Sequence, residues 1–292
     1  VLHEFDGRSW RRARGQTFPQ PEVVTEGDPI GYQITLEPHD RNWILALDLP
    51  TAWPEREAFR TYDFQLLSPR PVSDVATFRL ESHVRFRAGE SLPVSMRRKD
   101  TQLPDEGNPQ AVALGRELAR RFPQDAPAIV GAMLRLFREQ PYVYTLEPPK
   151  LADDAVDEFL FDTRRGFCEH YASAFTFVMR AAGVPARVVT GYQGGELNPL
   201  RGYLLVRQSD AHAWSEVWID GRGWVRVDPT AAVAPERIER GLIASLPENE
   251  PVPGRLRQES EAWLQVTLAW DAANDFWNER VVRFNAVGQM RL

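Results

Sequence analysis

The stretch RRGFCEHYASAFTFVMRAAGVP occupies residues 164–185 and contains the only cysteine of the chain, Cys168. Its apolar positions recur with helical spacing. The stripe consists of Cys168, Ala172, Phe175 and Met179. Gly183 and then Pro185 follow, as is typical of the end of a helix. The pattern therefore predicts a helix whose first turn carries Cys168.

A thiol in the first turn of a helix is well placed for nucleophilic chemistry. The unpaired N–H groups and the helix dipole there favour the thiolate form, and the same N–H groups can stabilise an oxyanion. Arg164 and Arg165 add positive charge, and Gly166 permits a tight turn beside the thiol. A single cysteine excludes an intramolecular disulfide and the usual paired-cysteine zinc sites. Cys168 is therefore either a buried packing residue or a nucleophile.

A candidate base and its orienting carboxylate lie on a predicted hairpin downstream. Residues 211–219, AHAWSEVWI, alternate in the manner of a strand and include His212. Glycine-containing residues 220–223 form the turn, and residues 224–228 form the return strand. Asp228 stands at the end of that strand. In thiol enzymes a histidine takes the thiol proton and a carboxylate holds its ring in the required tautomer.

The register of this hairpin decides whether His212 and Asp228 meet. A three-residue loop containing glycine puts both side chains on one face, whereas a two-residue loop puts them on opposite faces. The three-residue loop would set Asp228 opposite Trp214 or Glu216. With Trp214 as its partner, Asp228 has His212 on its diagonal, about 7–8 Å away between backbones.

Several motifs together resemble the transglutaminase-like core. In chain order they are RGFCEHYA at residues 165–172, RAAGVPARVVTGY at 180–192, HAWSEVW at 212–218, and Gly223-Trp224 followed by Asp228-Pro229-Thr230. The resemblance implies an α+β fold. In this fold a small β-rich domain precedes a papain-like transglutaminase core. In the core, a helix that carries the cysteine at its N-terminus packs on an antiparallel sheet. It also implies a catalytic triad of Cys168, His212 and Asp228.

The resemblance implies thiol-dependent acyl transfer from a protein glutamine side-chain amide to a primary amine. The residues alone leave two alternatives open. One is a cysteine protease or amidase that uses the same triad on envelope peptides, and the other is a non-catalytic binding domain. The residues that line the site would distinguish a transferase from a hydrolase, because a transferase must exclude water and admit an amine.

The candidate wall residues are aromatic. Trp214, Trp218 and Trp224 either form a tunnel or are ordinary core aromatics. The loop at residues 193–202 is either a lid or a plain hairpin connection. Animal transglutaminases place an aromatic residue at the oxyanion, and the candidates here are Tyr142 and Tyr144.

The chain divides into three predicted parts: a β-rich N-terminal domain at 1–105, a catalytic core at 106–248 and a helical C-terminal tail at 249–292. Alternating residues at 31–36 and 75–86 predict strands of a small sandwich. Apolar residues recur every seven positions in the tail, at Leu256, Trp263, Trp270, Trp277 and Phe284. This seam either packs on the rest of the chain or leads to a bilayer.

Composition limits the partners and cofactors. The chain of 292 residues has a formal net charge of -6, unlike the basic surface of a nucleic-acid binder. The expected partners are protein or peptide substrates, a glutamine donor and an amine acceptor. Acidic residues cluster at Asp153, Asp154, Asp157 and Glu158. They lack the spacing of a calcium-binding EF-hand and fit the negative charge of a helix start, so we expect no metal and no cofactor.

Lysine is nearly absent from the chain. Lys99 and Lys150 are the only lysines among 35 Lys and Arg residues. A codon bias toward arginine is the simplest explanation. The alternative is an enzyme that uses lysine amines as substrates and avoids modifying itself.

The chain carries no stretch that approaches the roughly 18 apolar residues of a membrane span. It begins with Val1 rather than Met, and we interpret it as part of a longer protein. The motifs and the flanking segments together resemble membrane-anchored bacterial transglutaminase-like proteins. That resemblance implies a domain that faces the periplasm and is attached to the inner membrane through segments absent from this chain.

Overall fold

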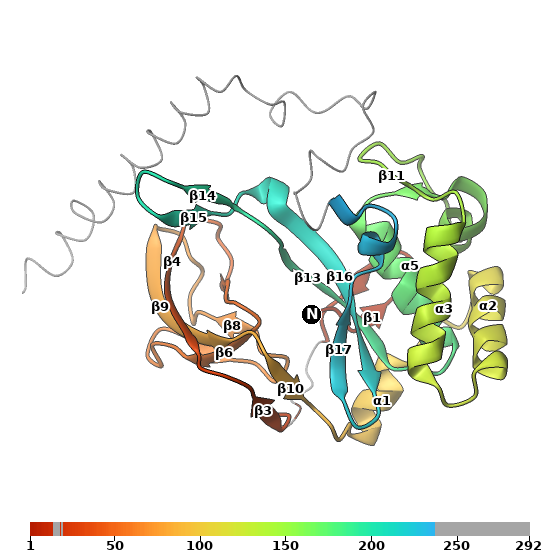
Figure 1. Cartoon of the computed structure of the whole chain (residues 1–292), viewed down its shortest axis with the longest axis horizontal. Coiled ribbons are helices and arrows are strands. Elements are labelled where there is room, and N and C mark those ends of the chain that lie inside the picture. Colours follow the sequence, from red (N-terminus) through yellow and green to blue (C-terminus); the bar gives the residue numbers. More distant parts are fainter. Residues whose placement is uncertain (14–17, 19, 237–292) are drawn as a thin grey trace, which may run out of the picture.

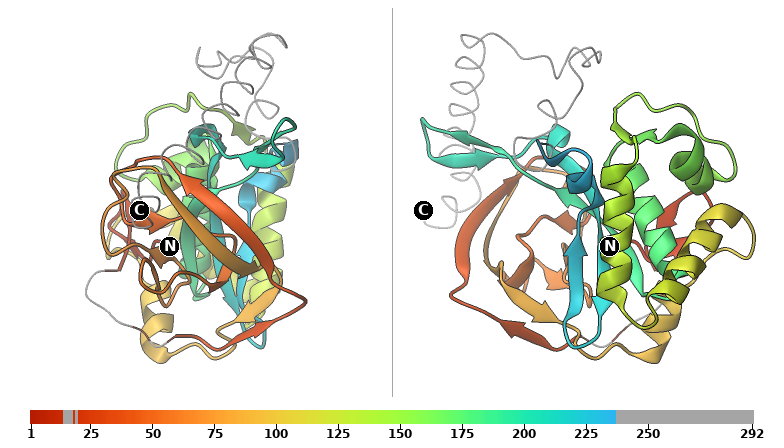
Figure 2. Two further views of the ribbon diagram at one scale, coloured as in Figure 1. Left: turned by 90° about the vertical axis from the view of Figure 1, so that its left-hand side faces the viewer. Right: turned by 45° about the vertical axis from the view of Figure 1, so that its right-hand side comes forward.

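The computed structural model describes residues 1–13, 18 and 20–236. In these residues a β-rich N-terminal part lies beside a part built of helices and sheet (Figure 1). The central sheet of the second part lies between the N-terminal strands and the helices (Figure 2). The predicted tail, 249–292, and the end of the predicted core lie outside the described residues.

The N-terminal part builds its core from two small antiparallel sheets. Their strands, in sheet order, are β4 (Ile30–Leu36), β9 (Ala76–His83) and β6 (Leu49–Ala52), then β5 (Trp43–Ile44), β8 (Leu66–Leu67) and β7 (Phe59–Arg60). Alternate residues of β9 are buried, as the two-residue period of a strand requires. Phe78 from one sheet and Leu66 from the other belong to a shared apolar core. The strands predicted at 31–36 and 75–86 are confirmed as β4 and β9.

The first residues of the chain pack on the second part rather than on the N-terminal sheets. They form the strand pair β1 (Glu4–Phe5) and β2 (Trp10–Arg11). Leu2 bridges to Val188 in the central sheet, and Trp10 Nε1 donates a hydrogen bond to Ser173 Oγ at 2.8 Å. The domain division at residue 105 stays a prediction, and these residues, which it assigns to the N-terminal domain, contact the other part.

The next elements are a further strand pair and three helices, the last two of which share their apolar core with α5 (Cys168–Ala181) in the second part. They are β3 (Val23–Thr25) with β10 (Phe86–Ala88), then α1 (Val94–Asp100), α2 (Pro109–Arg121) and α3 (Ala126–Glu139). Asp125 begins α3 by accepting the N–H of Ala128 at 2.9 Å, which satisfies one of the free donors of the first turn. None of the helices in the described ranges has the length and apolarity that a membrane crossing requires.

Helix α5 (Cys168–Ala181) packs on one face of the central sheet and confirms the helix predicted from the cysteine stretch. The sheet is antiparallel, with the order β13 (Ala186–Tyr192), β16 (Ala211–Ile219) and β17 (Gly223–Val227). Ser215 faces the helix, because its hydroxyl donates to the carbonyl of Ala172 at 3.2 Å. The predicted α+β class, with a cysteine-bearing helix on an antiparallel sheet after a β-rich part, is confirmed.

Gly115 lets α2 approach α5 closely from the side opposite the sheet. A Cβ at this position would lie 2.5 Å from the Cβ of Ala181 and 2.7 Å from the carbonyl oxygen of Val178. Any larger residue would therefore push the two helices apart.

Short elements complete the described fold. They are β11 (Val143–Tyr144), which runs parallel to β12 (Arg165–Gly166), helix α4 (Ala155–Asp157), a π-helical turn (Glu158–Thr163), β14 (Glu196–Asn198), β15 (Tyr203–Leu205), and 3₁₀ turns at Gln208–Asp210 and Pro229–Ala232. The loop at residues 193–202 is part of the β14–β15 hairpin, which extends from the end of β13 (Figure 1).

The acidic cluster serves the start of a helix, as the sequence predicts. The two carboxylate oxygens of Asp157 accept the N–H groups of Gln110 and Ala111 at 2.8 and 2.7 Å. Asp154 accepts the N–H of Asn108 at 2.6 Å. These carboxylates therefore cap the N-terminus of α2, a helix that lies more than 30 residues before them in the sequence.

Candidate active site

Cys168 is the first residue of α5 and is only 8% exposed. Val188 and Ala213 of the central sheet belong to its apolar surroundings, so the thiol lies beside the strand that carries His212. Gly166 precedes it, and a Cβ there would meet the side chain of His170 at 2.7 Å. Glycine therefore allows β12 to run directly into the first turn of α5.

His212 and Asp228 form a direct hydrogen bond. Nε2 of His212 lies 2.6 Å from Oδ2 of Asp228, and the histidine side chain is fully buried. Oδ1 of Asp228 accepts the N–H of Thr230 at 3.1 Å. Because a carboxylate only accepts, Nε2 carries a hydrogen, and in the neutral ring Nδ1 is then the nitrogen with the lone pair. Nδ1 is buried and has no hydrogen-bond partner in the part of the chain that the structure describes.

Of the two hairpin registers that the sequence leaves open, the structure has the one that puts His212 and Asp228 on one face. Ser215 pairs with Val227 and Ile219 pairs with Gly223, which leaves a three-residue loop. Continued by one residue, this register sets Asp228 opposite Trp214 and His212 on the diagonal. The 2.6 Å hydrogen bond shows that the side chains close that diagonal.

Trp214 supports the ring of His212. The two rings are stacked with centroids 6.2 Å apart and planes at 24°. Arg226 lies over the indole at 4.1 Å. Gly191 pairs with His212 across the sheet, and a Cβ there would lie 2.8 Å from Trp214 Cη2. Sequence reasoning missed Arg226 and Gly191, although the alternation of β17 puts Arg226 on the same face as Asp228.

The other two tryptophans lie where the two parts of the molecule meet. Trp218 Nε1 donates to the carbonyl of Gly89 at 2.8 Å. Trp224 lies under Arg187 at 3.9 Å and lines a cavity of about 180 Å³ together with Tyr62. Trp214 is thus the tryptophan of the three that contacts His212, and the contacts of the other two fit the core-aromatic alternative.

Neither tyrosine suggested for the oxyanion is placed as a free donor. The hydroxyl of Tyr142 donates to the carbonyl of Leu160 at 2.8 Å, and burial raises the pKa of Tyr142 to about 12. This contact corrects the suggestion for Tyr142, because its hydrogen is already committed to the backbone. Tyr144 is buried and stacks on Tyr171 with centroids 6.4 Å apart.

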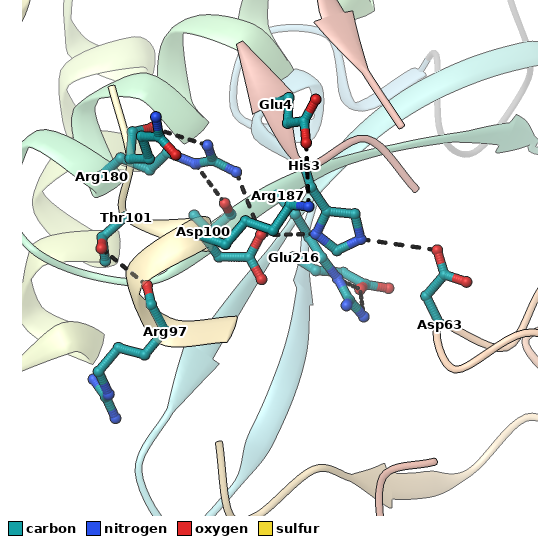
Figure 3. A network of polar contacts seen from close by, with 12 residues as sticks. His3, Glu4, Asp63, Arg97, Asp100, Thr101, Arg180, Arg187 and Glu216 are labelled. Carbon is teal, nitrogen blue, oxygen red and sulfur yellow. Dashed lines mark hydrogen bonds and ion pairs between the residues drawn. The ribbon is translucent and has the colours of Figure 1, made fainter. Parts of the chain in front are cut away.

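A network of buried ionic contacts involves residues of the N-terminus, α1, α5 and the central sheet (Figure 3). His3 Nδ1 lies 2.7 Å from Asp100 Oδ1, and the same oxygen lies 3.5 Å from Arg180. Arg187 holds Glu216 through two contacts of 2.7 and 2.8 Å. Sequence reasoning missed this network, because its members come from distant segments. It ties the start of the chain to the sheet that carries the candidate site.

A helix that begins with a buried cysteine and packs on an antiparallel sheet is typical of the papain-like class of fold. Here a hydrogen-bonded pair, His212 on β16 and Asp228 just after β17, accompanies it. The family model of the transglutaminase-like superfamily matches residues 116–229, and that of the TgpA N-terminal domain matches residues 1–88. The chain therefore belongs to the transglutaminase-like superfamily, and within it to the proteins with a TgpA-type N-terminal domain.

Individual relatives agree with this assignment. The chain is 41% identical over 296 residues to a protein-glutamine gamma-glutamyltransferase of Pseudomonas aeruginosa, a match that covers 99% of this chain and 44% of the relative. It is 37% identical over 139 residues to the uncharacterized protein YebA of Bacillus subtilis, which covers 44% of this chain and 18% of that protein. The chain spans less than half the length of either relative.

A solved structure has the same fold. The crystal structure of the periplasmic domain of TgpA from Pseudomonas aeruginosa matches with a TM-score of 0.80 and 44% identity. The match covers 84% of this chain and 85% of that one.

Proposed function

We propose that this chain is the catalytic domain of a protein-glutamine gamma-glutamyltransferase that uses Cys168, His212 and Asp228. The observation that carries the proposal is the hydrogen bond from His212 Nε2 to Asp228, which leaves a buried Nδ1 without a partner among the described residues. Such a nitrogen can take the thiol proton, as catalytic thiol–imidazole pairs require. The name of the Pseudomonas aeruginosa relative supports the choice of substrate class.

The proposed reaction has two acyl-transfer steps. His212 Nδ1 takes the thiol proton, and the sulfur of Cys168 attacks the amide carbon of a glutamine side chain. The imidazolium returns the proton to the leaving nitrogen, ammonia departs, and a thioester remains. A primary amine then attacks the thioester and gives its proton to His212. The carbon–sulfur bond breaks, which releases the new amide and restores the enzyme.

The surroundings of the thiol support both steps. Backbone N–H groups in the first turn of α5 are donors for the oxyanion of each tetrahedral intermediate. Burial of Cys168 and His212 limits the access of water, which favours an amine over water as acceptor. We infer that Asp228 orients His212 in both steps and does not itself transfer a proton.

The proposed location follows from the relatives. The matched structure is a periplasmic domain. We infer that this chain faces the periplasm, that protein or peptide substrates reach it there, and that segments outside this chain attach it to the bacterial inner membrane.

The test is incorporation of a fluorescent primary amine into a glutamine-rich protein, with peptide cleavage followed in the same samples. Cys168→Ala is the control. Incorporation that depends on Cys168, without cleavage, is the expected result. Cleavage that depends on Cys168, without incorporation, would make the chain a hydrolase on this fold. Incorporation that survives in Cys168→Ala would remove the thiol from the mechanism.

A further inference from the structure

The chain has very few lysines, and the two that it has differ in their exposure to solvent. Of 35 Lys and Arg residues, only Lys99 and Lys150 are lysine. Arginine does not deprotonate in proteins, so its guanidinium is not an acceptor amine for acyl transfer. The two lysines are therefore the only side chains of this chain that could attack a thioester as primary amines.

Lys99 is withdrawn from solvent. It lies on α1 with 8% of its side chain exposed, and its Nζ lies 3.2 Å from Glu4 Oε1. Its ammonium also lies 5.6 Å from the ring of Phe18. An amine held in this way cannot enter an active site without leaving its partners.

Lys150 is the opposite case. It is exposed in the loop between β11 and α4, and no ion pair of its amine is found within the described part of the chain. The loop is fixed at both ends: the N–H of Thr145 donates to the carbonyl of Gly166, and the N–H of Ala152 donates to Glu158, each at 2.9 Å.

The loop also begins beside the candidate nucleophile. Strand β11 pairs with β12, and Gly166 at the end of β12 is two residues before Cys168. Tyr144, the last residue of β11, is six residues before Lys150. The only exposed lysine amine of the chain is thus carried by a segment anchored just before the start of α5.

We propose that Lys150 is a modification site of this chain, the single lysine at which the enzyme accepts an acyl group itself. The inference rests on the proposed acyl-transfer function. The neutral ε-amine of Lys150 attacks the thioester between Cys168 and a glutamine-derived acyl group. A nitrogen–carbon bond forms, the carbon–sulfur bond breaks, the amine proton passes to His212, and an isopeptide bond joins Lys150 to the donor.

The experiment uses the 292-residue chain and, as donor, a fluorescent glutamine-containing peptide that has no lysine and a blocked amino terminus. No other amine is added. The expected result is Cys168-dependent labelling that peptide mapping assigns to Lys150. Lys150→Arg keeps the charge and removes the acceptor, and its labelling should fall to the level of Cys168→Ala. Lys99→Arg is the matched control and should be labelled like the unmodified chain.

A second assay on the same proteins separates this inference from the proposed function. Lys150→Arg should incorporate a fluorescent primary amine into a glutamine-rich protein at the unmodified rate, because the triad is intact. Amine incorporation without labelling of Lys150 overturns the inference alone, as does a label that maps to Lys99 or to the amino terminus. Absence of both reactions overturns the proposed function and the inference together.

Discussion

Oδ2 of Asp228 lies 2.6 Å from Nε2 of His212, and the other oxygen of the same carboxylate accepts the N–H of Thr230 at 3.1 Å. The carboxylate is therefore held from two sides. One contact comes from the ring that it orients, and the other comes from the 3₁₀ turn that Pro229 begins. Such an arrangement fixes both the tautomer and the direction of the imidazole.

Replacement of Asp228 by Asn should leave the fold intact and lower the rate of acyl transfer by about 10⁴-fold, as the triad template suggests. The Asn oxygen can still accept the N–H of Thr230, and its amide group then faces Nε2 of His212. Two donors cannot share that contact, so the ring changes tautomer and Nδ1 no longer accepts the thiol proton. Amine incorporation measures the rate, and circular dichroism checks the fold. An unchanged rate would remove Asp228 from the mechanism.

Gly191→Ala should lower activity by about ten- to a hundredfold through displacement of Trp214. The new Cβ would lie 2.8 Å from Trp214 Cη2, and that indole stacks on His212. Gly31→Ala is the matched control, because a Cβ at that strand position has no atom within 4 Å. The measurements are kcat and thermal unfolding of both variants. Equal kcat values would mean that Trp214 does not position His212.

Gly115→Ala should lower the free energy of unfolding by about 1–3 kcal/mol, because the Cβ would overlap Ala181 on α5. Gly131→Ala in α3 should instead raise it by about 0.5–1 kcal/mol, since its nearest neighbour is the flexible end of Arg135 at 3.8 Å. Urea unfolding of the two variants measures the difference. A stabilising Gly115→Ala would contradict the close packing of α2 on α5.

The stability of the chain should fall in mild acid partly because of His170. Burial against Phe159 and Phe167 lowers the pKa of His170. The unfolded chain then binds a proton near the ordinary pKa of about 6.5, before the folded chain does. Stability from this group is therefore present above that pH and is lost as the pH falls toward the folded pKa. The urea midpoint of His170→Gln should drop less between neutral and mildly acidic pH than that of the unmodified chain. A parallel pH dependence would exclude His170 as a cause.

Local patterns were sufficient for the helix of Cys168 and for the hairpin of His212 and Asp228. Helical spacing and the Gly183–Pro185 stop define α5, because both signals act within a few turns of one segment. Loop length decides the parity of a hairpin register, and it was the structure that showed the three-residue loop around Gly221, which puts the two side chains on one face. The closure of the diagonal to a hydrogen bond required the structure.

Other parts of the site depend on segments that are far apart in the sequence. No local period indicates that Leu2 bridges to Val188, or that Asp157 serves the start of α2. The core role of Tyr142 was equally hidden, because it depends on the carbonyl of Leu160.

The sequence by itself determined the class of fold, the candidate triad and the near-absence of lysine, because each follows from residue identity and short-range spacing. Only the tertiary structure decided which tryptophan contacts His212, and which of the two lysines is exposed. Contact and exposure of this kind depend on how segments far apart in the sequence pack together, and that packing is a property of the whole fold.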